Sequence, residues 1–472
     1  MATIIEQQPL SNPGTADKVL PVGQEIIYTV SNSSVVSSFT NVKFIAEVHI
    51  SNSTPPNPNT TNDLVGTFKT TPNNAGVGMF DFRPIIESFV NADNLAREGS
   101  AYKGTTNTLN SNVPVHLIDK YSGNINTMRW FNVKFMVEYI DNDPTSATYG
   151  DLITNSEVIA GMCIIFNGYL KYTDELLLSG VNFGYDLYSN FLLDGSTKKF
   201  LTNAPTTQYA NLEDYGTVGL LMPYTAVGIE IIYFDSAGNY LSQEQINFTA
   251  ANGGFLYPQA NIQASLLYFG LFPANLQGSS TMFQGYVSAG TIQGGHYNLA
   301  VLNDTGQVSS STYTINLNCP TLKGYEPIRL TWLNQWGAWD YYTFNMKSTK
   351  TISTKGSTYQ QLQGTWNKSS YKIDSFKGGK KAFRVNATEK IKMNTDFVSE
   401  SESEWFEELI NSPEVYILEG FQDDTVNSAL NNYVIPVRLT TSSYTKKTVA
   451  NDKLMQYTFE VEKSKTLRTQ SV

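Results

Sequence analysis

Charged side chains are scarce in this sequence, and basic ones are absent from a long internal stretch. Only 16% of the 472 residues are charged, and the formal net charge is −10. No Lys or Arg occurs between Lys199 and Lys323; residues 1–319 carry 12 basic and 25 acidic side chains, and residues 320–472 carry 20 and 17. An acidic balance excludes general nucleic-acid binding, and we expect no direct recognition of a nucleic-acid sequence. This uneven distribution of charge along the chain indicates either complementary charge at subunit contacts or domains of different descent.

Cysteine and histidine are also rare. Cys163 and Cys319 are too far apart in the chain to indicate a disulfide framework or a metal site, and Cys163 lies in an apolar run that predicts a buried free thiol. His49, His116 and His296 stand in no nucleophile or metal motif, and the common signatures of acyl transfer, zinc binding and phosphate binding are absent. We therefore predict no enzymatic activity and no catalytic, cofactor-binding or metal-binding residue.

Long apolar runs are missing as well. No run approaches the ~20 residues that a membrane helix needs, and residues 218–234 are interrupted by Pro223 and Glu230. The N-terminus has neither the charged region nor the apolar region of a secretory signal. We expect no membrane span and synthesis in a cytoplasm, with exit by a route such as lysis if the protein acts outside the cell.

Strand patterns dominate what is present. The predicted class is mainly β, with two or three antiparallel β-sandwich-like domains and a few short helices. We expect an N-terminal arm at 1–20, a β-sandwich domain at 21–174, a middle β domain at 175–320 that lacks Lys and Arg from 200 to 320, and a C-terminal β domain at 321–472.

Period-two alternation of apolar and polar residues marks the individual strands. Residues 42–50 and 131–139 alternate most clearly and predict a sheet with one solvated face, with His49 on the polar side. Ile85, Ile86, Phe89 and Val90 have helical spacing after Pro84. Further strands are predicted at 25–30, 64–70, 158–170, 227–233, 299–302, 312–317, 328–333, 341–347, 381–385, 415–419, 433–440 and 454–462.

An aromatic stretch, residues 330–344, is interrupted by a turn at 334–337. It predicts a hairpin whose rings form the core of the C-terminal domain, or rings that lie at a subunit interface. Its aromatic residues are Trp332, Trp336, Trp339, Tyr341, Tyr342 and Phe344.

One helix, at about 401–411, is well signalled in the C-terminal domain. Ser401 and Glu404 have the spacing of a capping box. The apolar face is formed by Trp405, Leu409 and Ile410.

Residues 345–392 are unusually basic, with 10 Lys and Arg384 against Asp374 and Glu389. This segment predicts either a solvated β-meander or a patch that meets the acidic surface of a neighbour.

Acidic groups give no strong site. Residues 141–151 only faintly resemble a calcium loop, since the central Gly and closing Glu are missing and Pro144 interrupts them. Adjacent residues on a helix point about 100° apart, so Glu407 and Glu408 cannot face each other across a sugar and are expected on a solvated face. The pair Asp423–Asp424 carries no further signal.

Several stretches, covering about a third of the chain, resemble structural proteins of tailed bacteriophages. They are similar to virion proteins, tail or baseplate components among them, of phages such as those of Bacteroidetes hosts. The resemblance implies a β-sandwich subunit of a symmetric ring or tube, and it transfers no catalytic residue. The motifs are F-x-x-V-x-F-x-x-x-V-x-I at 39–50, G-x-F-D-F-x-x-I-I at 78–86, W-L-N-Q-W-G-A-W-D-Y-Y-T-F at 332–344, W-F-E-E-L-I-N-S-P-E-V-Y at 405–416, P-V-R-L-T-T-S-S-Y at 436–444 and Y-T-F-E-V-E at 457–462.

Three functional hypotheses follow. The first is a non-enzymatic tail, tail-ring or baseplate subunit, located in the virion, that assembles with copies of itself and other tail proteins, with residues 1–20, 51–63 and 92–114 reaching into neighbours. The second is a host-receptor or glycan-binding tail protein. The third is a polysaccharide or cell-wall hydrolase, which requires two carboxylates about 5–10 Å apart.

Overall fold

The computed structural model describes residues 2–9, 18–52, 56–96, 113–171, 187–223, 225–248, 265–318, 324–419, 434–441, 443, 445, 455–465 and 467–468. Internal packing divides the chain into two units. The first unit comprises Met1–Asn318 with Leu333–Asp340, and the second comprises Cys319–Trp332 with Tyr341–Val472. The structure is mainly β, with several antiparallel sheets and few short helices, which confirms the predicted class. The predicted boundary between a β-sandwich domain and a middle β domain, at residues 174 and 175, stays a prediction.

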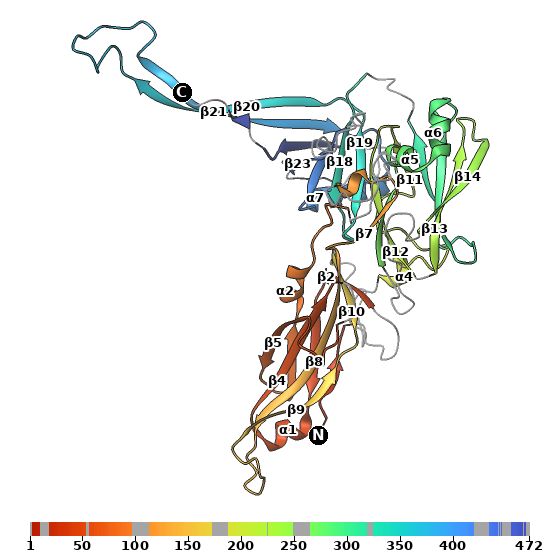
Figure 1. Cartoon of the computed structure of the whole chain (residues 1–472), viewed down its shortest axis with the longest axis vertical. Coiled ribbons are helices and arrows are strands. Elements are labelled where there is room, and N and C mark those ends of the chain that lie inside the picture. The colour runs from red at the N-terminus through yellow and green to blue at the C-terminus, as the bar shows by residue number, and fades with distance from the viewer. Residues whose placement is uncertain are drawn as a thin grey trace. The chain divides into compact units, whose positions relative to one another are not determined.

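Two sheets face each other in the N-terminal part of the first unit (Figure 1). The smaller sheet has the order β1 (Ile4–Gln7), β3 (Ile27–Ser31), β6 (Val77–Asp81). The larger has the order β2 (Lys18–Gly23), β10 (Cys163–Tyr169), β8 (Met128–Ile140), β4 (Thr40–Ser51), β5 (Leu64–Thr70), with β9 (Leu152–Ile159) also paired with β8. Short helical segments are α1 (Ser33–Ser38), α2 (Arg83–Ile86), η1 (Glu87–Phe89) and η2 (Val115–Leu117).

Alternation along β4 and β8 explains the core of this sandwich. Their antiparallel register sets Ala46 opposite Phe135 and Val48 opposite Val133, and all four side chains are buried. The ring of Tyr28 from the smaller sheet lies 5.6 Å from that of Phe135. Burial of each large apolar side chain contributes roughly 1.5–3 kcal/mol, so the strand period decides which face points inward.

Two predictions for this region are wrong. Within the predicted arm at 1–20, residues 4–7 and 18–20 lie in strands, because β1 pairs with β3 and β2 runs parallel to β10. Val19 and Leu20 of β2 are fully buried, whereas β1 is held by its strand pairing and stays largely exposed, with Ile4 at 55%. His49 is buried rather than solvated, with Nδ1 3.4 Å from the carbonyl oxygen of Asn62. Its cross-strand neighbour Asn132 is buried as well, so the polar face is covered at this point.

The rest of the first unit contains a five-stranded sheet and a three-stranded one. Helix α6 (Thr281–Ser288) lies over one face of the five-stranded sheet, where the ring centroids of Tyr233 and Phe283 are 5.7 Å apart. The five-stranded order is β11 (Thr207–Ala210), β17 (Tyr313–Leu317), β16 (His296–Asn303), β13 (Ala226–Phe234), β14 (Tyr240–Asn247). The three-stranded order is β12 (Thr217–Met222), β15 (Ser265–Gly270), β7 (Tyr121–Gly123). The helices are α4 (Tyr188–Phe191), α5 (Pro273–Ser279) and α6 (Thr281–Ser288).

Strands β18 (Ile328–Leu333) and β19 (Trp339–Phe344) form the predicted aromatic hairpin. Its rings are buried inside the chain, but not all in one core. Trp332, Tyr341 and Phe344 belong to the second unit, whereas Trp336 and Trp339 pack in the first. The prediction of a single C-terminal core is therefore wrong, because the turn residues find their partners much earlier in the sequence.

The second unit is an eight-stranded sheet with one helix. Its order is β19, β18, β22 (Val415–Leu418), β23 (Val434–Leu439), β24 (Thr458–Lys463), β21 (Gly379–Asn394), β20 (Thr349–Gln361), and β25 (Leu467–Arg468) pairs with β21. Helix α7 (Glu400–Asn411) packs its apolar face on this sheet. Phe406 is central, with ring centroids 4.9 Å from Tyr342, 5.5 Å from Phe459 and 6.3 Å from Trp332.

Helix α7 corrects two details of the prediction. Its N-cap is Ser399, and the capping box pairs Ser399 with Glu402 rather than Ser401 with Glu404. Glu408 is buried rather than solvated. The sequence offers the same Ser-x-x-Glu spacing twice, and Val398 selects the first, because its backbone pairs with Met455 and ends the extended segment there.

Candidate interaction surface

The longest strand pair in the structure, β20 with β21, extends beyond the rest of its sheet (Figure 1). The register runs from Thr349 opposite Lys392 to Gln361 opposite Gly379. Among the described strands, β24 and β25 pair with β21 only at residues 386–387 and 390–394. Residues 379–385 and their partners on β20 thus form a ribbon of two strands, here called the ribbon.

The ribbon has no buried face of its own. None of its residues at 356–361 or 379–385 is buried, and Phe383 is 50% exposed. An isolated two-stranded ribbon is marginally stable in water, because neither face buries enough apolar surface. A surface of this shape is typical of one that is completed by another molecule.

Apolar side chains continue around the loop that closes the ribbon. Trp366 is 68% exposed and Phe376 is 71% exposed, among the highest values for large apolar residues in the described part of the chain. Large exposed apolar patches on soluble proteins mark interaction sites. The apolar tip consists of Leu362, Trp366, Tyr371, Ile373, Phe376 and Phe383.

Local hydrogen bonds give this loop a defined shape. The Thr365 hydroxyl donates to the Ser370 carbonyl at 2.8 Å and accepts from the Lys372 backbone N–H at 2.9 Å. The Tyr371 hydroxyl donates to the Gln363 carbonyl at 3.0 Å, and its ring lies 5.5 Å from that of Trp366. The rings are therefore held outward by the loop's own backbone.

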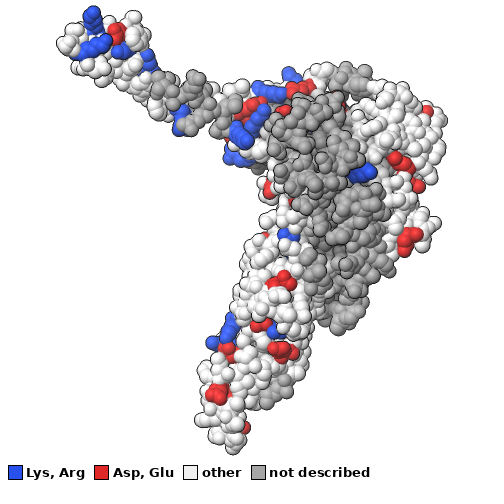
Figure 2. Space-filling view, viewed as in Figure 1, with Lys and Arg blue, Asp and Glu red and all other residues white. Residues whose placement is uncertain are grey.

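Positive charge surrounds the apolar tip (Figure 2). One of the amines, Lys377, pairs with Asp374 at 3.1 Å, and Lys381 Nζ donates to the Phe376 carbonyl at 2.6 Å. Asp374 is the single acidic residue between 362 and 384. The basic residues in that interval are Lys368, Lys372, Lys377, Lys380, Lys381 and Arg384.

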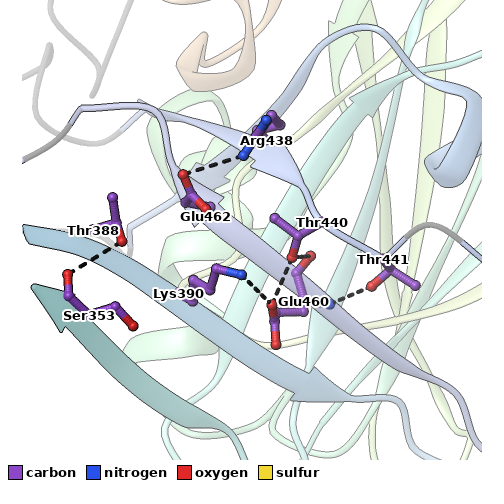
Figure 3. A network of polar contacts seen from close by, with 8 residues as sticks. All are labelled: Ser353, Thr388, Lys390, Arg438, Thr440, Thr441, Glu460 and Glu462. Carbon is purple, nitrogen blue, oxygen red and sulfur yellow. Dashed lines mark hydrogen bonds and ion pairs between the residues drawn. The ribbon is translucent and has the colours of Figure 1, made fainter. Parts of the chain in front are cut away.

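A network of polar contacts anchors the base of β21 to the sheet (Figure 3). Lys390 and the Thr440 hydroxyl both bond to Glu460, at 3.2 and 2.9 Å. These hydrogen bonds, that of Thr440 first, lower the pKa of Glu460, which therefore stays ionised. Arg438 pairs with Glu462 at 3.5 Å on the adjacent strand. These side chains link β21, β23 and β24 at the end of β21 that lies within the sheet.

The histidines and acidic residues weighed from the sequence do not converge. His116 is buried with its ring 4.7 Å from Trp339, and His296 stacks on Phe234 at 4.6 Å. Asp141 accepts from the Thr148 hydroxyl at 2.6 Å, and hydrogen bonds from Ser146 and Thr148 lower its pKa.

The hydrogen bonds from Ser146 and Thr148 are sufficient to hold the Asp141 carboxylate in this loop, so its conformation needs no bound cation. Within the ranges described, no three His, Cys, Asp or Glu side chains gather into a group that could hold a metal ion. Cys163 is a buried free thiol, as predicted. Cys319 and the pair Asp423–Asp424 lie outside the described residues.

The apolar tip was missed by sequence reasoning, although the basic segment that contains it was noticed. Alternation is the usual strand signal, and a ribbon exposed on both faces does not alternate. The usable signal was the interleaving of Trp366, Tyr371 and Phe376 with lysines between Gly364 and Gly378.

Comparisons with known proteins assign no family. No family model matches the chain, and no curated protein matches it. The structural comparison found the C-terminal domain of the AgI/II polypeptide BspA of Streptococcus agalactiae, with 9% identity over 67% of this chain and 99% of that one and a TM-score of 0.13. It also found that of the antigen I/II-family protein AspA of Streptococcus pyogenes, with 8% identity over 67% and 98% and a TM-score of 0.13. TM-scores at this level carry no argument about fold or function. In the described part of the chain, no helix is both long and apolar enough to cross a membrane.

Proposed function

We propose that the protein is a non-enzymatic structural subunit of a phage virion, in a tail, tail ring or baseplate, that assembles with copies of itself and with other tail proteins. The observation that carries the proposal is the apolar tip, which the chain holds in a defined shape but leaves exposed. Aromatic residues are enriched at protein interfaces, and charged residues are depleted at interface cores. The low charge content of the chain supports the same conclusion. The resemblance to phage structural proteins supplies the virion context.

Sedimentation velocity of the purified full chain, over a wide range of concentrations, tests this function. We expect discrete oligomers whose proportion grows with concentration, each interface burying more than about 1,000 Å². A monomer at every concentration, alone and mixed with neighbouring tail proteins, would contradict the proposal.

The apolar tip also favours a second candidate, a host-receptor or glycan-binding tail protein. Exposed rings such as Trp366 and Tyr371 can stack on the apolar faces of sugars. Binding of the full chain to an array of bacterial surface glycans tests this candidate. If the protein is a glycan-binding tail protein, the wild type should bind a glycan both as an oligomer and as a monomer. Trp366→Ser should abolish this binding in both states.

A further inference from the structure

We infer that the apolar tip of one copy docks on the five-stranded sheet of a second copy, against the face that carries Glu230. This inference rests on the proposed function and names the partner of the apolar tip. It assigns each subunit one donor surface and one different acceptor surface, so the contact is heterologous, the kind that generates rings or tubes.

The acceptor face follows from the strand register. Phe234 on β13 is opposite Tyr240 on β14 and His296 on β16, so these rings share one face of the sheet. Helix α6 packs at Tyr233, whose side chain points to the other face. The acceptor face consists of Glu230, Ile232, Phe234, Tyr240, Gln243 and His296.

This face has apolar area that matches the apolar tip. His296 stacks on Phe234 with the ring planes 6° apart, and Tyr240 meets the edge of Phe234 at 6.3 Å. Tyr240 is 58% exposed. A flat group of rings on a rigid sheet can receive the side chains of Trp366 and Phe376, and contact between them removes apolar surface of both copies from water.

Charge favours an encounter between the apolar tip and this part of the chain. The interval 362–384 has six basic residues and one acidic residue, whereas residues 200–318 have six acidic residues and no Lys or Arg. Glu230 lies half-buried on the acceptor face, and Asp235 follows in the turn between β13 and β14. Acidic side chains are visible around these strands (Figure 2). Opposite charges orient such a contact, and like charges placed against each other disfavour it.

A charge exchange between two variants tests the contact. The tip variant carries Lys368→Glu, Lys372→Glu and Lys380→Glu, which leave three basic and four acidic residues in the interval 362–384. The acceptor variant carries Glu230→Lys. In each variant alone the two surfaces carry charge of the same sign, so we expect self-association at least about tenfold weaker than in the wild type. In an equimolar mixture, the reversed tip of one variant can meet the reversed acceptor face of the other. The native tip of the acceptor variant can likewise meet the native acceptor face of the tip variant. We therefore expect the mixture to regain the association of the wild type.

The control variant, Lys43→Glu with Lys347→Glu and Lys465→Glu, makes the same change of net charge as the tip variant at exposed residues outside both surfaces. It should associate as the wild type does. Circular dichroism melts of all variants should coincide at concentrations too low for self-association, because none of the substituted side chains is fully buried.

The outcomes separate the inference from the function on which it rests. If the wild type assembles and the tip variant assembles equally well, the inference is overturned and the structural function stands. If both variants dissociate but the mixture stays dissociated, the acceptor face is overturned. Tip-dependent binding to phosphatidylserine vesicles or to an acidic glycan, with unchanged self-association, also overturns the second copy as partner. A wild type that stays monomeric alone but binds neighbouring tail proteins overturns the inference only. A wild type that associates with neither overturns function and inference together.

Discussion

The indole Nε1 of Trp339 donates a 2.9 Å hydrogen bond to the backbone carbonyl of Asp93, 246 residues earlier in the chain. The carboxylate of Asp93 accepts from the backbone N–H groups of Ile125 and Asn126, at 3.0 and 2.6 Å, and from the Tyr268 hydroxyl at 3.1 Å. Trp339 is only 1% exposed. A residue of the aromatic hairpin therefore completes a buried polar cluster of the first unit.

Removing the Trp339 ring should destabilise the first unit strongly. Trp339→Ala leaves a cavity and an unpaired carbonyl, and we expect a loss of about 3–5 kcal/mol in the free energy of unfolding. Trp339→Phe retains most of the ring and should lose about 1–3 kcal/mol for the unsatisfied acceptor. Urea denaturation measures both. Trp366→Ala is the matched control at an exposed site, and an equal loss there would show that Trp339 is not an anchor.

Deprotonation of Asp93 should lower the free energy of unfolding as pH rises. Burial raises the pKa of this carboxyl, although hydrogen bonds from Thr127, Asn126, Ile125 and Tyr268 lower it in part. A raised pKa means that the folded state binds the proton more tightly than the unfolded state does. The contribution of Asp93 is therefore fully present below its unfolded pKa of about 3.9 and is lost as pH rises through the folded pKa.

The measurement is the difference in unfolding free energy between wild type and Asp93→Asn at a series of pH values. This difference should fall as pH rises above about 4. Asp143 gives the opposite control, because hydrogen bonds from Thr145 lower its pKa. The stabilisation by Asp143 is present above its unfolded pKa and is lost as pH falls, so its difference curve should rise with pH. A flat curve for Asp93→Asn would contradict the assignment.

Gly337, in the turn between β18 and β19, should not accept any side chain. Its φ is +71°, and a Cβ there would lie 2.1 Å from the carbonyl oxygen of Asn167. Gly238 has φ of +81° but no atom within 4 Å of such a Cβ. Gly238→Ala should cost about 1–2 kcal/mol for the backbone conformation alone. Gly337→Ala adds a backbone clash, so its melting temperature should fall much further; equal shifts would show that Asn167 moves freely.

Strands that alternate, or that are apolar throughout, could be predicted from the sequence. Leu64–Thr70 and Ile328–Leu333 match the structure to the residue. Of the ribbon, only residues 381–385 within β21 were predicted as a strand. Strand β20 could not be located this way, because it has no buried face and hence no period. The burial of His49 and of Glu408 was also invisible, because it depends on how other segments pack against them. The basic segment around the apolar tip was found from composition, which needs no contact information.

Helix α7 offers a case in which two local signals have equal strength and a distant contact decides between them. Both Ser399 and Ser401 precede a Glu by three residues. In the structure Ser399 Oγ accepts from the Glu402 backbone N–H at 3.3 Å, and the Glu402 carboxylate accepts from the Ser399 backbone N–H at 2.7 Å.

Ser399→Ala should therefore lower the free energy of unfolding of the second unit by about 0.5–2 kcal/mol, since an N-terminal donor of the helix loses its acceptor. Ser401→Ala lies within the first turn of the helix and should change it by less than about 0.5 kcal/mol. Thermal melts followed at the far-ultraviolet helix signal compare the two variants. If Ser401→Ala were the more damaging, the helix would begin two residues later, and the pairing of Val398 with Met455 would not set its start.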